Sequence, residues 1–216
     1  MKLAATPAAS AITARDQGTE VKEQIVDEAS TDVRWPIRSN RLTIRPATPK
    51  DVEATWNYRR LPEVFEWLPR SAPTRDVYAS AFVESPRLER TLVVEHEGVV
   101  VGDLYLHVHD AWAQAEVASA GVAAEAEIGW VLDPQHGGRG LATEAVAALI
   151  EACFFQLTVR RVHASCIADN VPSWRLMERL GMRREGHGRN EALHRDRGWL
   201  DGYHYAVLAT EWPRGS

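Results

Sequence analysis

The sequence predicts an α/β domain in which helices cover the faces of one β-sheet. Its 216 residues, of which 45% are hydrophobic and 25% charged, suit one globular domain with a substantial core. Segments with strand and helix periodicity follow one another as strand, helix, helix, three strands, helix, strand, helix and two final strands. No internal repeat interrupts this order, so a solenoid is not expected.

The first part of the chain is predicted to lie outside this domain. Residues 1–38 show no sustained periodicity and are rich in Ala, Thr, Asp and Glu, so we expect a disordered N-terminal arm. A single domain then covers 39–214. The opening residues, MKLAATPAASAITARD, resemble a signal peptide only faintly, because their centre is not Leu-rich.

The domain is expected to begin with a short strand over 42–44. Helices follow over 49–58 and 74–84, the second capped by Thr74 and ended by Ser85–Pro86. A hairpin over 91–109 turns at Glu97–Gly98. One of its faces is apolar: Leu104, Leu106 and Val108.

A loop or short helix over 110–121 leads to the second half of the domain. This half contains strands over 126–133 and 161–168, separated by a helix over 140–157 whose exposed stripe is Glu144 and Glu151. A short helix lies between two caps, and the last strand, GWLDGYHYAVLATEW, follows a polar, Arg-rich loop. The expected caps are Asn170 and Gly181.

The segment LDPQHGGRGLATEA, residues 132–145, indicates an anion site. It places three glycines and Arg139 between an apolar strand and a helix. The first N–H groups of a helix lack partners and carry partial positive charge, and glycines let a phosphate approach the backbone. A pyrophosphate is therefore the expected ligand. The P-loop lysine is absent, and Thr143 breaks the dinucleotide fingerprint.

Within this segment, 135–140 has the pattern Q/R-x-x-G-x-G/A, and here the chain resembles the GNAT superfamily of acetyl-coenzyme A-dependent N-acetyltransferases. More narrowly, it is similar to the branch of the ribosomal-protein alanine N-acetyltransferases. Four blocks carry the resemblance, in the family's order, over about residues 40–212. They are RLTIRPATPKDV, AEIGWVLDPQHGGRGLATEAV, ADNVPSWRLMERLGMRREG and WLDGYHYAVLATEW.

The resemblance implies the GNAT fold, a mixed, mostly antiparallel central sheet flanked by helices. Its central strands, at 124–132 and 161–168, would splay apart and admit the pantetheine arm of acetyl-coenzyme A, while the loop 135–140 holds the pyrophosphate. The implied acetyl-coenzyme A-binding residues are Trp130, Val131, Leu132, Gln135, His136, Gly137, Gly138, Arg139, Gly140, Leu141, Ala142, Asn170 and Ser173.

Acetyl transfer to an amine needs a base or water relay for the amine proton and a hydrogen-bond donor for the carbonyl oxygen. It does not require a covalent enzyme intermediate. Glu127 is the best candidate for the base, because related enzymes often carry a glutamate there; Glu125 shares its face and is the alternative. Glu127 could instead simply end a half-solvated strand. The resemblance implies oxyanion donors among the backbone N–H groups near Trp130 and Val131.

Many family members protonate the leaving thiolate with a tyrosine on the helix after the 161–168 strand. This chain has no tyrosine there and, like the ribosomal-protein branch, carries Asn170 and Ser173. The resemblance implies that Ser173 is the acid and that Asn170 holds the pantetheine, although both residue types also suit a helix start. Tyr203 and Tyr205 on the last strand are weaker candidates.

Two tryptophans, Trp67 and Trp112, are expected to border the acceptor site. Arg195 and Arg197 are interpreted as a solvated charged loop rather than substrate contacts.

Neither a metal site nor a disulfide framework is expected. His107 and His109 share a strand face, but no third ligand has an obvious spacing, so no metal is predicted. The two cysteines, Cys153 and Cys166, cannot form a disulfide framework, which favours a cytoplasmic protein.

The formal net charge of −5 argues against nucleic acid as a partner, and no apolar run is long enough to predict a membrane span. The sequence leaves monomer and homodimer open. The expected function is transfer of the acetyl group of acetyl-coenzyme A to a primary amine by direct attack, with a protein N-terminus as acceptor. The alternatives are a small amine, such as an aminoglycoside, polyamine or amino acid, and a non-catalytic acyl-coenzyme A sensor.

Overall fold

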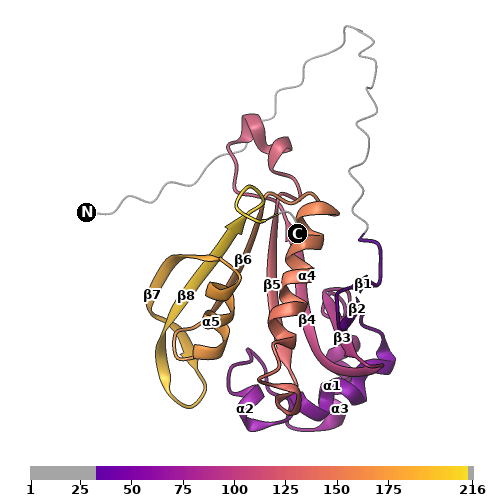
Figure 1. Cartoon of the computed structure of the whole chain (residues 1–216). Coiled ribbons are helices and arrows are strands. Elements are labelled where there is room, and N and C mark those ends of the chain that lie inside the picture. Colours follow the sequence, from indigo (N-terminus) through magenta and orange to yellow (C-terminus); the bar gives the residue numbers. More distant parts are fainter. Residues whose placement is uncertain (1–32, 214–216) are drawn as a thin grey trace, which may run out of the picture.

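The computed structural model describes residues 33–213, and most of the arm predicted from the sequence therefore lies outside the described residues. The described chain folds into one eight-stranded sheet with the order β1-β2-β3-β4-β5-β6-β8-β7 (Figure 1). The strands are β1 (Ile37–Arg38), β2 (Leu42–Pro46), β3 (Thr91–His96), β4 (Val99–His109), β5 (Glu125–Leu132), β6 (Arg161–Ile167), β7 (Arg183–His194) and β8 (Gly198–Leu208).

Helices connect several of these strands. The α-helices are α1 (Val52–Arg59), α2 (Pro62–Phe65), α3 (Arg75–Val83), α4 (Leu141–Phe155) and α5 (Val171–Arg179). Short 3-10 helices are η1 (Pro49–Asp51), η2 (Ala115–Gly121) and η3 (Pro134–His136). Thr74 caps α3 and the hairpin turns at Glu97–Gly98, both as predicted.

The alternation of side chains divides the helices between the two faces of the sheet. On β3, Leu92 and Val94 belong to the main core, which also contains the buried side of α4 and residues of α5. Val93 points the other way and packs with α1 and α3 in a second cluster. The sheet is thus the middle of three layers, with α4 and α5 on one face and α1 and α3 on the other.

β5 and β6 form the one parallel pair among the described strands, and only a short stretch of them is paired. Three residue pairs join them, from Glu125–Arg161 to Glu127–His163. Beyond Glu127 the two strands diverge, as Figure 1 shows between β5 and the β6–β8 half of the sheet. This divergence, called the fork below, confirms the predicted mixed, mostly antiparallel sheet with splayed central strands.

The packed domain starts earlier than predicted. Val33 and Ile37 are buried in the main core, and Ile37 pairs with Ile44 on the neighbouring strand. The sequence does not indicate this earlier start, because a two-residue edge strand is too short to produce a readable alternation.

The polar, Arg-rich loop expected before the last strand is mostly β7, and only a short turn separates it from β8. β7 lies at the edge of the sheet and most of its residues are exposed. The predicted order includes two final strands, but an edge strand without a buried face carries no apolar alternation, so the sequence did not show where the first of them lies.

Two details of the helices also differ. Asn170 occupies the N-cap position of α5, but its side chain makes no capping hydrogen bond. Glu144, expected on the exposed stripe of α4, instead accepts hydrogen bonds from Ser39 and Arg41. Gly181 has the left-handed φ of +74° expected after the end of α5.

Candidate active site

The fork leaves backbone donors of β5 without a partner strand. Asp133 N–H donates to the carbonyl of Val101 on β4 at 2.8 Å. Because successive residues of a strand direct their backbone groups to opposite sides, Val131 N–H also points to β4, whereas Ile128 and Trp130 N–H point to β6. Trp130, and not Val131, therefore directs its N–H into the fork. Of the two oxyanion donors expected from the sequence, only the N–H of Trp130 can reach a ligand there.

A cavity of about 1440 Å³ extends from the fork to the helices on the α1–α3 face. It brings together residues from β5, the loop after it, the start of α4 and the start of α5. The predicted site residues that line it are Glu127, Trp130, Val131, Leu132, Gly137, Gly138, Gly140, Leu141, Ala142, Asn170 and Ser173. Gln135, His136 and Arg139 do not line it.

The loop between β5 and α4 is held in a conformation that its glycines permit. Gly138 and Gly140 have φ of +73° and +76°, the left-handed region that other residues rarely adopt. Gly140 is the N-cap of α4, so the N–H groups of the first helical residues have no partner within the helix. Two of those residues, Leu141 and Ala142, line the cavity, so this loop has the features of an anion site.

Arg41, which is far from this loop in the sequence, holds it in place. Its guanidinium donates to the carbonyl of Arg139 at 3.0 Å and pairs with Glu144 on α4 at 2.6 Å. Burial of Glu144 opposes ionisation, but hydrogen bonds from Ser39 and Arg41 lower the pKa of its carboxyl group, so it remains charged at neutral pH. The sequence contained no local signal for this contact, because 103 positions separate Arg41 and Glu144.

The residues present fit a phosphorylated cosubstrate. A Cβ on Gly138 would meet nothing within 4 Å, so the backbone at that position is open to a ligand. Beside it, Nδ1 of His136 is buried and has no hydrogen-bond partner among the described residues. A buried polar nitrogen without a partner is costly, and a ligand or water at the loop would supply one.

Glu127 faces the cavity from β5 at the last paired position before the fork. Within residues 33–213 nothing hydrogen-bonds to its carboxylate, whereas the carboxylate of Glu125 is bonded to Arg161 at 3.0 Å. The two acidic candidates therefore differ: Glu127 is available to an incoming amine and Glu125 is already engaged.

Asn170 and Ser173 line the same cavity from the start of α5, across the fork from Glu127. The two tyrosines considered as alternative acids do not. Tyr205 is buried, and its hydroxyl is bonded to Glu178 at 2.9 Å and to Arg184 at 2.8 Å. Tyr203 packs under the Arg184 guanidinium, 3.9 Å from the ring centroid, and neither tyrosine lines the cavity.

The two tryptophans behave differently. Trp67 lines the cavity, as expected, and packs its ring against His194. Trp112 is 91% exposed near η2 and does not line it, so the expectation for Trp112 is wrong. Figure 1 shows the reason: η2 lies at the end of the sheet opposite the α1–α3 helices.

Arg195 and Arg197 are not the solvated loop predicted from the sequence. Arg195 donates to the carbonyl oxygens of Phe65 at 2.7 Å and Leu68 at 2.6 Å, and Arg197 pairs with Asp169. The turn between β7 and β8 thereby holds the segment after α2, which forms one wall of the cavity.

Sequence reasoning missed the arginines of the cavity. Arg59 pairs with Asp103, which is 2% exposed and also accepts from Tyr58 at 2.7 Å. Arg87 and Arg90 line the cavity too, but no carboxylate among residues 33–213 pairs with them. Burial, with Arg59 nearby, lowers the pKa of Arg87, the direction expected for a cation without a counter-ion.

The strand order, the fork and the glycine loop at the start of α4 together define the acyltransferase class that the sequence resembles. Residues 41–183 match the acetyltransferase (GNAT) domain, and the chain belongs to this family. It is accordingly an acetyltransferase, and membership of the family implies acetyl-coenzyme A as its cosubstrate. In the described residues no helix is long and apolar enough to cross a membrane.

Three similar proteins cover nearly all of this domain. A crystal structure of a GNAT-family acetyltransferase from Bacillus anthracis is 31% identical, with a TM-score of 0.69 over 82% of this chain and 99% of that one. The L-amino acid N-acetyltransferase AaaT of Escherichia coli (strain K12) is 27% identical over 77% of this chain and 98% of its own. Mycobacterium smegmatis RimJ, solved with CoA-disulfide, is 25% identical, with a TM-score of 0.64 over 81% and 85%.

Proposed function

We propose that this enzyme transfers the acetyl group of acetyl-coenzyme A to a primary amine by direct attack within a ternary complex. The observation that carries the proposal is the single cavity that joins Glu127, the fork and the glycine loop before α4. This cavity provides space for a phosphorylated cosubstrate on one side of the Glu127 carboxylate and for an amine on the other.

In the proposed reaction the amine nitrogen forms the new C–N bond while the thioester C–S bond breaks. Glu127, directly or through a water, accepts the proton that the amine loses. Trp130 N–H donates to the carbonyl oxygen as negative charge develops there. Ser173 donates its hydroxyl proton to the leaving thiolate and regains one from solvent, and Asn170 positions the pantetheine arm.

For the acceptor we propose an amine that carries a carboxylate close by, of which an amino acid is the simplest. Arg87 and Arg90 favour it, because two cavity arginines without acidic partners match an anionic group beside the reacting amine. Similarity to an L-amino acid N-acetyltransferase agrees with this choice. The N-terminal amine of a protein is the second candidate, favoured by the similarity to RimJ.

The test is thiol release from acetyl-coenzyme A with matched acceptors. Each amino acid is compared with its own carboxamide, which keeps the amine and removes the carboxylate, and with short peptides beginning in Ala, Ser or Met, polyamines and aminoglycosides. We expect saturable turnover with an amino acid and at least about a tenfold lower kcat/KM with its amide. Turnover of peptides alone would establish the second candidate.

Absence of turnover across this panel, with acetyl-coenzyme A still bound in calorimetry, would contradict the catalytic proposal and favour an acyl-coenzyme A sensor. An Arg87→Ala variant tests whether Arg87 binds the carboxylate of the amino-acid acceptor. It should raise KM for the amino acid and leave KM for acetyl-coenzyme A unchanged.

A further inference from the structure

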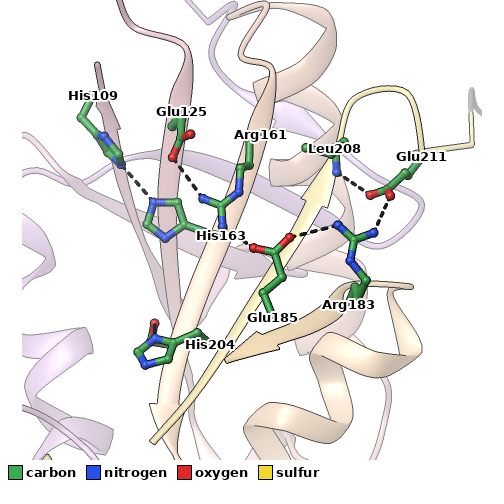
Figure 2. Close-up of polar contacts among 10 residues, drawn as sticks. His109, Glu125, Arg161, His163, Arg183, Glu185, His204, Leu208 and Glu211 are labelled. Atoms are coloured by element: carbon green, nitrogen blue, oxygen red, sulfur yellow. Dashed lines mark hydrogen bonds and ion pairs between the residues drawn. The ribbon is translucent and has the colours of Figure 1, made fainter. Parts of the chain in front are cut away.

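Three strands bring potential metal ligands together just above the fork. Nε2 of His109 on β4 lies 3.0 Å from Nε2 of His163 on β6. Glu125 on β5, between them in the sheet, completes a group whose ligand atoms all lie within 4.8 Å of one another. Figure 2 shows the two imidazoles facing each other, with the Glu125 carboxylate beside them. Of the two histidines considered from the sequence, only His109 belongs to this group, and its two other members lie on neighbouring strands.

We propose that His109, Glu125 and His163 bind a divalent transition-metal ion of the zinc type. Two imidazole nitrogens and one carboxylate oxygen are a donor set typical of zinc, whereas magnesium and calcium prefer oxygen alone. Two nitrogens that bind one tetrahedral ion at roughly 2.0–2.1 Å lie about 3.3 Å apart. The two rings therefore need to separate by only a few tenths of an ångström.

The hydrogen bonds around His109 prepare it as a ligand. Its Nδ1 lies 3.0 Å from the backbone carbonyl of Asp110, which can only accept, so Nδ1 carries the proton and Nε2 presents a lone pair. Metal-binding histidines in proteins are commonly oriented by this kind of bond to a carbonyl or carboxylate. An ion would take the place of the proton now shared between the two Nε2 atoms, and His163 would hold its own proton on Nδ1.

Arg161 contacts one member of this group, and its charge is balanced by two carboxylates. It is bonded to Glu125 at 3.0 Å and to Glu185 at 2.6 Å, as Figure 2 shows. Because a carboxylate has two oxygens, Glu125 can keep its contact with Arg161 through one and bind an ion through the other. Three protein ligands leave a fourth position for water.

The position of the site gives it a structural consequence. His163 and Glu127 are paired across β5 and β6 at the last position before the fork, and Glu125 lies two residues earlier. An ion bound there would join β4, β5 and β6 at the closed end of the fork. It would fix the spacing of the strands that carry Glu127 without entering the cavity, whose lining includes none of the three ligands.

The experiment is a titration of the purified, metal-free full-length protein with Co²⁺, followed by displacement with Zn²⁺. Four-coordinate Co²⁺ has an intense visible spectrum that six-coordinate Co²⁺ lacks. We expect this spectrum to develop at one ion per chain, to disappear on addition of Zn²⁺, and to be accompanied by a rise in thermal unfolding temperature with Zn²⁺.

The variants His109→Ala and His163→Ala should weaken Co²⁺ binding by at least about tenfold, and Glu125→Gln should do the same. His107→Ala is the matched control, because His107 lies on the same strand and face, with its ring 5.4 Å from that of His109, but outside the group. It should bind Co²⁺ as the parent protein does.

A parent protein that gives only the weak six-coordinate spectrum would overturn the proposal. Equal loss of binding in the His107 variant would overturn it too, since that would indicate non-specific binding to a histidine-rich face. Circular dichroism of each variant separates loss of the ligand from loss of the fold. None of these readouts depends on acetyl transfer, so their failure is distinct from failure of the proposed function.

Discussion

Glu127 combines two properties expected of a base for an amine: it faces the cavity, and its carboxylate has no hydrogen-bond partner among the described residues. Replacement by Gln keeps the shape and removes the proton acceptor. Glu127→Gln should therefore lower kcat by about 10²–10⁴-fold and leave the affinity for acetyl-coenzyme A unchanged. Steady-state kinetics and calorimetry on the same preparation measure both quantities.

Glu125 provides the comparison, because its carboxylate is engaged by Arg161 on the same face of β5. A large loss of kcat in Glu125→Gln together with normal turnover in Glu127→Gln would assign the base to Glu125 instead.

Cys166 is the one described cysteine that lines the cavity, and its environment disfavours a covalent mechanism. Burial raises the pKa of this thiol to about 11, so it is protonated at neutral pH and a poor nucleophile. Cys166→Ala should keep kcat within about twofold, since general acid–base steps account for the reaction. Loss of turnover, or an acetylated Cys166 in mass spectra of the enzyme with acetyl-coenzyme A, would contradict direct attack.

The loop before α4 owes its conformation to glycine. A substitution in this loop affects both the backbone strain and the binding of a ligand, so it needs a control that changes the strain alone. Gly138→Asp adds a carboxylate where a pyrophosphate is expected, so calorimetry should detect no binding of acetyl-coenzyme A.

Gly98→Asp is the matched control for this variant. Gly98 has a similar φ of +79° and equally open surroundings, but it lies at the β3–β4 turn. The Gly98→Asp variant should lose a comparable free energy of unfolding and bind acetyl-coenzyme A normally. Normal binding by the Gly138 variant would exclude this loop as the pyrophosphate site.

The junction between β2 and α1 depends on one ionised group. Burial of Asp51 opposes ionisation, but hydrogen bonds from Arg45 and Thr48 outweigh it and lower the pKa of its carboxyl group below the ordinary 3.8. A lowered folded-state pKa contributes stability that is present above pH 3.8 and is lost as the pH falls through the folded value. Asp51→Asn should reduce the free energy of unfolding by about 1–3 kcal/mol at pH 7, and by progressively less below about pH 4.

Urea unfolding at several pH values measures this difference. Glu53→Gln is the control, because Glu53 is exposed in the first turn of α1, the helix that Asp51 precedes, and its solvent-exposed pairing with Arg75 contributes little to stability. A difference between Asp51→Asn and the parent protein that does not shrink in acid would contradict the assignment to ionised Asp51.

At the level of the complete domain, the cavity depends on a contact between the β7–β8 turn and the segment around α2, which are far apart in the sequence. Arg195, in the β7–β8 turn, holds carbonyl oxygens of Phe65 and Leu68, which are 130 and 127 positions away in sequence. Arg195→Ala should loosen the wall formed by residues 62–70. We expect a three- to tenfold rise in KM for the acceptor, little change in KM for acetyl-coenzyme A, and faster hydrogen exchange in 62–70, roughly as for loss of a charged hydrogen bond.

Arg189→Ala on exposed β7 serves as the control, since Arg189 lies on the same hairpin and makes no ion pair with another described residue. If hydrogen exchange of 62–70 stays unchanged in the Arg195 variant, the turn does not support the cavity wall.

The sequence alone was sufficient for the features that are encoded locally. Alternation along 126–133, the glycines around Arg139 and the helix that follows predicted the strand, the loop and the start of α4, because each depends on residues within one turn or one strand of each other. The family resemblance, carried by these segments and by the block ADNVPSWRLMERLGMRREG, also predicted the fork and the candidate residues Glu127, Asn170 and Ser173.

Tertiary structure decided the features that depend on which segments become neighbours. The pairing of β4, β5 and β6 brings His109, Glu125 and His163 together, and the packing of α1 and α3 on the sheet brings Arg59, Arg87 and Arg90 into one cavity. The ion pair of Arg41 with Glu144 and the hydrogen bonds of Arg195 to the α2 segment likewise join residues that are far apart in the sequence. Side-chain periodicity records which face of a strand or helix is buried, but it does not record the partner against which that face packs.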